Sequence, residues 1–188
     1  MAVDVRGSRG ALGLYVLVAT AITTAVLAVL AHYLREPFIF PSVGPTIFIL
    51  FFAPLGLQAA PRNVIGGQLL GIACGYLALV IFGLTDEPAD IFDLSSASIG
   101  SAIVALSLTL SLMVWLGLPH APAGATTLIV ALGLVHTLPH LAILFLAVLV
   151  VVAIAFGINR AAGIPVPLWR PSPPVNAPSP PLNNLRQD

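Results

Sequence analysis

The stretch Pro41-Ser42-Val43-Gly44-Pro45-Thr46 interrupts apolar sequence in the first half of the chain, and His120-Ala121-Pro122-Ala123-Gly124-Ala125-Thr126 does so in the second. Each is followed by a short apolar run and then by a long one. In membrane proteins, short hydrophobic segments broken by Gly and Pro at matching positions of two repeats are the best sequence pointer to a substrate site. The pattern predicts a transporter rather than merely a membrane-embedded chain.

The composition places most of the chain in a bilayer. Of the 188 residues, 59% are hydrophobic and 7% are charged, and the mean hydropathy is +1.06. In soluble globular proteins about a quarter of the residues are charged, so the low charge of this chain indicates that most of it is not surrounded by water. The net charge is zero, and every basic residue is an arginine, so no polybasic stripe exists to bind nucleic acid. The lone cysteine, Cys74, lies in an apolar run and is expected to be a small buried hydrophobe.

The apolar runs fall into two length classes. A helix needs about 20 apolar residues to cross about 30 Å of hydrocarbon. Four runs meet that length: Ala11–Leu34, Val64–Leu84, Ile99–Leu118 and Pro139–Ile158. Two others, Pro45–Leu57 and Ala123–Val135, are only about 13 residues long, which is near 20 Å if helical. We therefore expect an all-α polytopic helix bundle.

The order long, short, long occurs twice. Gly44-Pro45-Thr46 lies 80 residues before Gly124-Ala125-Thr126, and Pro61 lies 78 residues before Pro139. This spacing predicts a membrane domain over residues 11–160 built as a tandem three-plus-three repeat, 11–84 and 99–160. It is flanked by a cytoplasmic N-terminus, 1–10, and a Pro-rich disordered tail, 161–188. If the short segments span, the halves are inverted; if they dip in and return, the halves are parallel.

Arginine placement bears on the number of crossings through the positive-inside rule. With six crossings only Arg35 lies outside, whereas with four crossings Arg62 also moves outside. Six crossings fit the rule better. Both arrangements put the two termini in the cytoplasm, and we expect a protein of the bacterial inner membrane. The acidic loop Thr85–Ser98 is outside with six crossings and inside with four, and we expect it to be a solvated connection.

The two breaks are the predicted binding site. Residues 41–45 and 119–124 are expected to be non-helical, because proline lacks an amide proton and glycine tolerates unusual dihedrals. The short helices would then begin near Gly44 and Gly124 with free N–H groups and about half a positive charge each, which suits a small anion. Hydroxyl groups would add donors, and they belong to Ser42, Thr46, Thr126 and Thr127. The alternative is that Ser42 and Thr46 simply cap the first turn.

Other polar residues near the breaks have two interpretations each. Arg62, followed by Asn63, is either an interfacial anchor or a fixed countercharge for the anion, helped by Gln68. His120 and His140 flank the second short segment, where a histidine usually caps a helix or lies at the interface. They are also the groups near the predicted pocket that titrate near neutrality, which leaves proton coupling open.

A separate pattern concerns packing. Gly67, Gly71 and Gly75 recur every four residues and so share one helix face, where small residues let another backbone approach. This seam would serve a homo-oligomer as readily as an intramolecular contact. Ser107 and Ser111 form a similar small polar face that we interpret as structural.

These residues resemble the HPP family of small integral membrane proteins. The similarity runs over about residues 11–160 and is carried by the two breaks, by Thr127, and most specifically by residues 61–68, Pro-Arg-Asn-Val-Ile-Gly-Gly-Gln. The family is named for a His-Pro-Pro motif leading into Ala-Gly-Ala-Thr; here the middle residue is Ala121. Plant chloroplast and cyanobacterial members are described as nitrite transporters. The resemblance thus implies a nitrite carrier, and nitrite is a small planar monoanion that suits a few aimed donors.

Three functions compete on the sequence alone. The leading hypothesis is a carrier of a small inorganic anion, with nitrite foremost. A non-selective small-solute channel and a non-transporting scaffold or accessory subunit are the alternatives. Under the first, replacing Arg62 by Gln and Thr126 by Val should abolish anion uptake. We expect no enzyme, cofactor or metal, because the sequence offers no Ser-His, carboxylate-pair or metal-ligand spacing.

Overall fold

The computed structural model describes residues 8–171 and is all-helical over that range. Six α-helices and one short 3-10 helix follow one another along the chain. They are α1 (Arg9–Leu34), α2 (Val43–Phe52), η1 (Leu57–Ala59), α3 (Pro61–Ile81), α4 (Ser96–Trp115), α5 (Ala123–Ala131) and α6 (Leu138–Ala161). The predicted all-α bundle is confirmed.

The two predicted length classes are also present. The helices α1, α3, α4 and α6 are long and apolar enough to cross a membrane. With 10 residues in α2 and 9 in α5, the short helices are each only about 14–15 Å long. Each short helix therefore covers about half of a hydrocarbon core of about 30 Å.

Local sequence signals fix where the long helices start. The side chains of Ser8, Ser95 and Thr137 each accept a hydrogen bond from a first-turn amide, as N-caps do. Pro61 is the first residue of α3, where its missing N–H is not needed. For this reason α3 starts three residues before the expected Val64.

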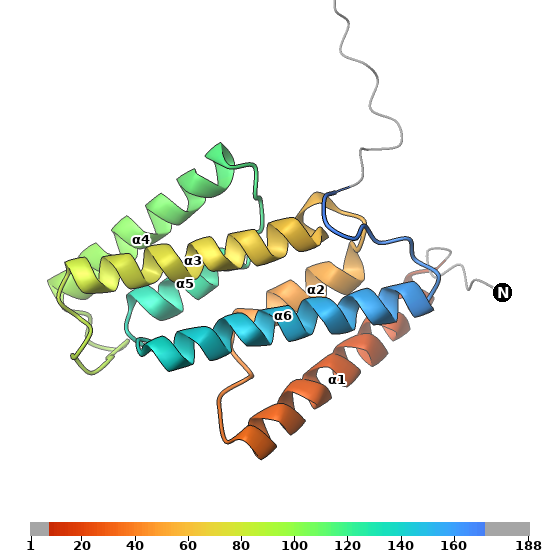
Figure 1. Ribbon diagram of the computed structural model, residues 1–188, viewed down its shortest axis with the longest axis horizontal. Coiled ribbons are helices and arrows are strands. Elements are labelled where there is room, and N and C mark those ends of the chain that lie inside the picture. The colour runs from red at the N-terminus through yellow and green to blue at the C-terminus, as the bar shows by residue number, and fades with distance from the viewer. Residues whose placement is uncertain (1–7, 172–188) are drawn as a thin grey trace, which may run out of the picture.

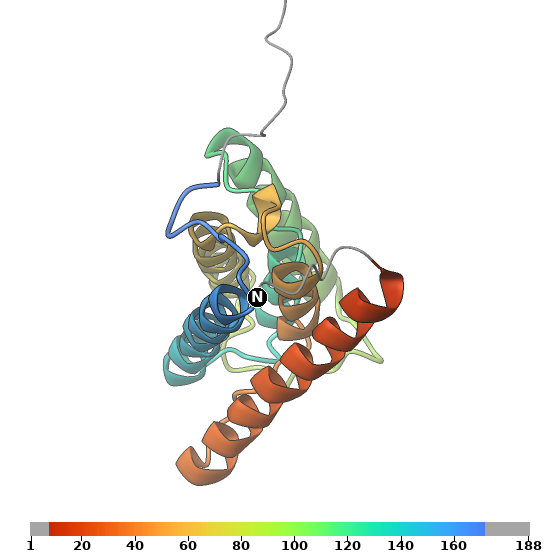
Figure 2. The same ribbon diagram turned by 90° about the vertical axis from the view of Figure 1, so that its right-hand side faces the viewer.

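The helices are arranged around a central antiparallel pair. Figure 1 shows α3 and α6 running in opposite directions through the middle of the bundle, and the two helices are in contact. The helices α1 and α4 lie on the outside, as the end-on view in Figure 2 shows. The first half of the bundle is α1 to α3 and the second is α4 to α6. The outer helix α1 contacts α2 of its own half and α6 of the other. The outer helix α4 correspondingly contacts α5 of its own half and α3 of the other. The short helices likewise pack on the other half, α2 on α6 and α5 on α3.

The short helices start close to each other. In Figure 1 both α2 and α5 begin near the middle of the bundle and run outward in opposite directions. The start of α1 and the end of α6 lie at one end of the bundle, and the loop between α3 and α4 lies at the other. Polar side chains on the first turns of the short helices are thus brought together in the interior.

The glycine seam packs α3 against α5. A Cβ added at Gly67 would lie 2.8 Å from the His120 Cβ, and one at Gly71 would lie 2.7 Å from the Ala123 carbonyl oxygen. At Gly75 the nearest atom would be the Val130 Cβ, at 2.8 Å. The predicted packing role is confirmed, and the seam is covered by the chain's own α5 rather than left for a second copy.

Two expectations about the breaks need correction. Residues 43–45 are helical, and so are residues 123 and 124, although both stretches were expected to be irregular. Pro45 is the third residue of α2, and the first turn of a helix tolerates proline because its N–H has no intrahelical partner there. Only the short turns before Val43 and Ala123 are irregular.

The ends of the chain are described only in part. After α6, residues 162–171 are non-helical; Val166 is buried, and the Trp169 carbonyl accepts a hydrogen bond from the Arg62 amide at 3.0 Å. The remainder of the predicted Pro-rich tail, 172–188, and residues 1–7 lie outside the described residues.

Candidate functional site

Four buried polar side chains meet where α2 and α5 begin. They come from the first turn of α2 (Thr46), the second turn of α3 (Gln68), the loop before α5 (His120) and the first turn of α5 (Thr126), and we call them the Gln68 cluster. Each is at most 1% exposed. Polar groups buried this deeply among apolar helices need partners, and here they satisfy one another.

Gln68 bridges the two short helices through its carboxamide. Its Nε2 donates to the Thr46 Oγ1 at 3.0 Å, and its Oε1 accepts from the Thr126 hydroxyl. The same Nε2 lies 3.5 Å from the His120 Nε2, and the Thr46 Oγ1 lies 3.2 Å from that nitrogen. One amide thus joins the N-terminal turns of two helices that are far apart in the sequence.

The orientation of His120 is fixed by η1. The His120 Nδ1 lies 2.9 Å from the Gln58 carbonyl oxygen, which only accepts, so Nδ1 carries the proton of the neutral ring. Nε2 is then the unprotonated nitrogen, and it faces Thr46 and Gln68. The Gln58 side chain also holds the loop, because its Oε1 accepts from the Ala121 amide at 2.9 Å. Ala121 is therefore held in place through its backbone amide.

Thr127 belongs to a neighbouring polar contact rather than to the Gln68 cluster. Its Oγ1 is 2.9 Å from the Ala123 carbonyl oxygen and 3.0 Å from the Thr109 Oγ1 on α4. Both threonines are fully buried. This contact joins α5 to α4 at the residue that follows Thr126.

Ser42 and Asn63 are fully buried, and each keeps one polar atom without a partner. The Ser42 Oγ and the Asn63 Oδ1 have no hydrogen bond in the described structure. Ser42 immediately precedes α2, and its carbonyl accepts from the Thr46 Oγ1 at 3.2 Å. Asn63 donates to the Leu57 carbonyl at 2.8 Å. An orphan hydroxyl next to the Gln68 cluster is a free donor for a ligand.

Arg62 is not brought into the Gln68 cluster. Its guanidinium donates to the Gly117 carbonyl at 2.9 Å and to the Leu116 carbonyl at 3.3 Å, at the end of α4. A cation at a helix C-terminus is favourable because the last carbonyls carry partial negative charge. The countercharge interpretation of Arg62 therefore has no geometric support.

The predicted free amides are mostly paired. At α5 the amides of Ala123, Gly124 and Ala125 donate to the carbonyls of residues 120, 121 and 122 at 3.0–3.1 Å, which corrects the expectation of orphan donors near Gly124. These turns tighten the helix start but leave its dipole directed at the cluster. At α2 neither Ser42 nor Thr46 caps the first turn with its side chain, so the capping alternative is not observed. Gly44 itself is exposed and has no atom within 4 Å of an added Cβ, so α2 reaches the cluster through Thr46 and not through Gly44.

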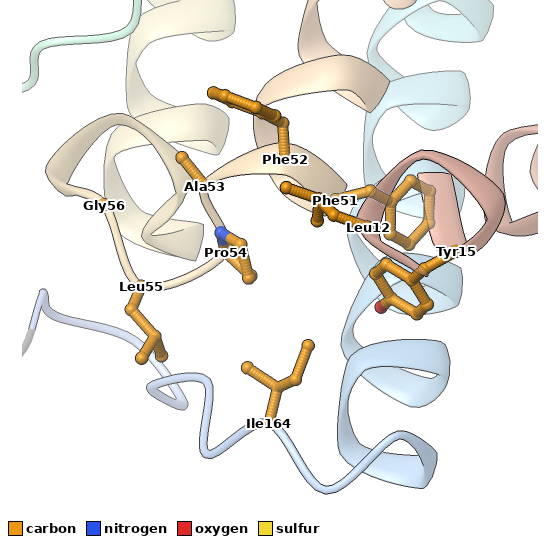
Figure 3. Close-up of a pocket in the computed structure, with 9 residues that line it drawn as sticks. All are labelled: Leu12, Tyr15, Phe51, Phe52, Ala53, Pro54, Leu55, Gly56 and Ile164. Carbon is orange, nitrogen blue, oxygen red and sulfur yellow. The ribbon is translucent and has the colours of Figure 1, made fainter. Parts of the chain in front are cut away.

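A separate apolar cavity of about 340 Å³ lies between α1, the end of α2 and the segment after α6 (Figure 3). Tyr15 and Phe51 line it from the helices, and Leu55 and Ile164 line it from the loops. The Tyr15 hydroxyl already donates to the Asn159 Oδ1 at 2.7 Å. This cavity therefore offers an anion little, and it contains no member of the Gln68 cluster.

Sequence reasoning missed the central residue. Gln68 entered only as a helper of Arg62, while Gln58 and Thr109 were not considered. An uncharged amide inside an apolar spanning helix is itself a signal, because polar side chains at that depth are costly unless partnered. The partners of Gln58 and Thr109, in contrast, depend on loop placement. Among the described residues, no group of three His, Cys, Asp or Glu side chains is placed to hold a metal ion.

Comparison with known proteins gives one match. The family described as HPP, transmembrane region, matches residues 9–167. No curated protein and no solved structure matches the chain.

Proposed function

The chain belongs to the HPP transmembrane-region family. We propose that it transports a small inorganic anion, with nitrite as the leading candidate. The match covers every described helix, so the whole bundle is the unit of function. The single observation that carries the proposal is the Gln68 bridge between the starts of α2 and α5.

The chemistry of the Gln68 cluster favours a negative ligand. The cluster is rich in hydrogen-bond donors. They are the rotatable hydroxyls of Thr46 and Thr126 and the planar NH₂ group of Gln68. The unpartnered hydroxyl of Ser42 adds another. No carboxylate takes part in the hydrogen bonds of the cluster in the described part of the chain. The starts of α2 and α5 lie beside the cluster, so both helix dipoles favour negative charge there, although the first amides of α5 are already paired.

A compact anion would take the place of the internal hydrogen bonds. In the structure, Gln68 donates to Thr46 and accepts from Thr126, so these polar groups satisfy one another. Nitrite is planar and accepts through both oxygens, and it would receive the bonds that now run between Thr46, Gln68 and Thr126. The exchange leaves every donor paired, and its cost is the Gln68 Oε1, which loses the Thr126 hydroxyl.

The arrangement of helices supports alternating access. The contacts of α1, α2 and α3 correspond to those of α4, α5 and α6 when the halves are exchanged. The short helices run in opposite directions from a shared starting region (Figure 1), as expected for an inverted repeat with its site at the midplane. On this proposal the chain crosses the membrane six times, and both termini are cytoplasmic.

Uptake by reconstituted protein tests the proposal. Full-length protein in proteoliposomes should take up nitrite in a saturable manner at neutral pH, where little nitrite is protonated, and protein-free vesicles give the background. Thr126→Val should lose this uptake because the valine cannot donate. Ser107→Ala, on the exposed face of α4, is the matched control and should transport normally.

The outcomes separate the competing functions. Saturable uptake that other small monoanions compete with supports the carrier. Uptake that never saturates indicates a small-solute channel, and no protein-dependent uptake indicates a scaffold or accessory subunit; either result contradicts the proposal.

A further inference from the structure

His120 is the one titratable side chain in the Gln68 cluster, and it is 1% exposed. Its ring is held from two sides. Nδ1 faces the Gln58 carbonyl of η1, and Nε2 faces Thr46 of α2 and Gln68 of α3. The backbone at Gly67 packs against the base of this side chain, because a Cβ there would lie 2.8 Å from the His120 Cβ. A group held this firmly presents one nitrogen, Nε2, to the place where the helix starts meet.

No charged group accompanies the ring in the described structure. The hydrogen-bond partners from η1, α2 and α3 are a carbonyl, a hydroxyl and an amide, with no carboxylate, arginine or second histidine among them. Arg62, the nearest arginine along α3, is bonded to the end of α4 instead. None of these partners would balance a positive charge on the His120 ring, so burial favours the neutral ring. A bound anion supplies the missing opposite charge.

We propose that His120 binds one proton when an anion enters the Gln68 cluster and releases it when the anion leaves, so that the protein carries the two together. This inference rests on the proposed anion transport and names its coupling ion. It gives His120 the role of a countercharge that appears only on protonation, in place of the fixed countercharge that was one interpretation of Arg62.

The proton step balances without any other reactant. On the loading side, a proton from water bonds to the lone pair of the His120 Nε2, while Nδ1–H keeps its bond to the Gln58 carbonyl. The imidazolium then donates from Nε2 towards the anion beside Thr46 and Gln68. On the other side of the membrane the Nε2–H bond breaks, the proton returns to water, and the anion leaves with it. One positive and one negative charge move together, so transport is electroneutral.

Linkage sets the expected pH dependence. If the empty site is unprotonated and the occupied site is protonated, raising the pH disfavours the occupied form. The dissociation constant for nitrite should then rise by up to about tenfold per pH unit through the neutral range. By reciprocity, bound nitrite increases the affinity of His120 for protons by the same factor by which protonation of His120 increases the affinity for nitrite.

The test is a proton count during nitrite binding. Full-length protein in detergent is titrated with sodium nitrite in weakly buffered solution that contains a pH-sensitive dye. We expect uptake of about one proton per bound nitrite. His120→Gln keeps a donor near the Nε2 position but cannot titrate, so its proton uptake should vanish and its nitrite affinity should no longer change with pH. His140→Gln is the matched control, because His140 is exposed at 3.7 Å from Glu36.

Each outcome of this experiment either supports or overturns the proton coupling. Proton uptake in the wild type and in His140→Gln, but not in His120→Gln, supports the coupling. Nitrite binding without proton uptake in the wild type overturns it, and this result holds even if His120→Gln fails to fold. Proton uptake that persists in a folded His120→Gln protein overturns it as well. Absence of nitrite binding to the wild type removes the anion site itself, and thus fails the proposed function rather than only its coupling.

Discussion

Gln68 is the residue on which the interior depends most. Its carboxamide is fully buried and holds the hydroxyls of Thr46 and Thr126. Replacing it by leucine preserves volume but leaves both hydroxyls without their main partner, and an unpaired buried polar group costs about 1–3 kcal/mol. We expect Gln68→Leu to lower the free energy of unfolding by about 2–3 kcal/mol and to abolish nitrite binding.

Thermal melting of the purified protein measures the first of these effects. Ser107→Ala removes a hydroxyl from an exposed position of α4 and should change stability by less than about 0.5 kcal/mol. If Gln68→Leu melts as the wild type does, the bridge is not a stabilising contact.

Arg62 illustrates a different expectation at the residue scale. Because its guanidinium bonds the last carbonyls of α4, Arg62→Gln should weaken that helix end by about 1 kcal/mol. It should leave the nitrite dissociation constant within about twofold of the wild-type value. Isothermal titration checks the affinity, and a loss of binding larger than tenfold would restore the countercharge interpretation.

Only part of the site could be predicted from residue types and their spacing. Thr46, Thr126 and His120 were predicted to approach one another, and the structure brings them into one cluster. The choice between the two interpretations of Arg62 could not be made from the sequence, because its partner, the carbonyl of Gly117, belongs to a loop whose path no local pattern specifies. A side chain as long as arginine reaches several alternative acceptors, and tertiary packing selects among them.

At the scale of elements, the seam between α3 and α5 positions the site. Gly71 meets the Ala123 backbone so closely that a methyl group would lie 2.7 Å from its carbonyl oxygen. Gly71→Ala should therefore force α5 away from α3 and lower stability by about 1–3 kcal/mol. Because α5 carries Thr126, nitrite affinity should fall as well.

A matched glycine gives the opposite expectation. Gly157 lies within α6, is exposed, and has no atom within 4 Å of an added Cβ. Gly157→Ala should leave stability unchanged or raise it by up to about 1 kcal/mol. Equal melting temperatures for Gly71→Ala and Gly157→Ala would contradict the proposed tightness of the seam.

Helix existence was predictable, and helix starts less so. Length and hydropathy identified all four long helices and both short ones, since a bilayer demands runs of a fixed length. The start of α2 at Val43 is one residue before the expected Gly44, and the helical state of residues 43–45 was missed because Pro45 was taken as a breaker, whereas the first turn of a helix tolerates proline. The pairing of the α5 amides with the preceding turn also depends on backbone geometry that the sequence does not determine.

At the scale of the whole molecule, the direction of each helix makes a topological prediction. In Figure 1 the loop between α3 and α4 lies at the end of the bundle opposite the start of α1 and the end of α6. Six crossings then place Ser95 outside and Leu168 inside. In a Cys74→Ala background, Ser95→Cys should react with a membrane-impermeant maleimide from outside the cell.

Leu168→Cys is the matched position for the opposite side, since Leu168 is 76% exposed. It should be labelled only after the membrane is opened. Labelling of both positions from the same side would favour four crossings with parallel halves.

The most direct test of the meeting of α2 and α5 is equilibrium binding of nitrite to the purified full-length protein by isothermal titration, comparing the wild type with Thr126→Val. We expect about one nitrite bound per chain in the wild type and at least a tenfold weaker affinity in the variant, in line with the loss of one charge-assisted hydrogen bond. No binding to the wild type, or equal binding to both proteins, would contradict the assignment of an anion site to the Gln68 cluster.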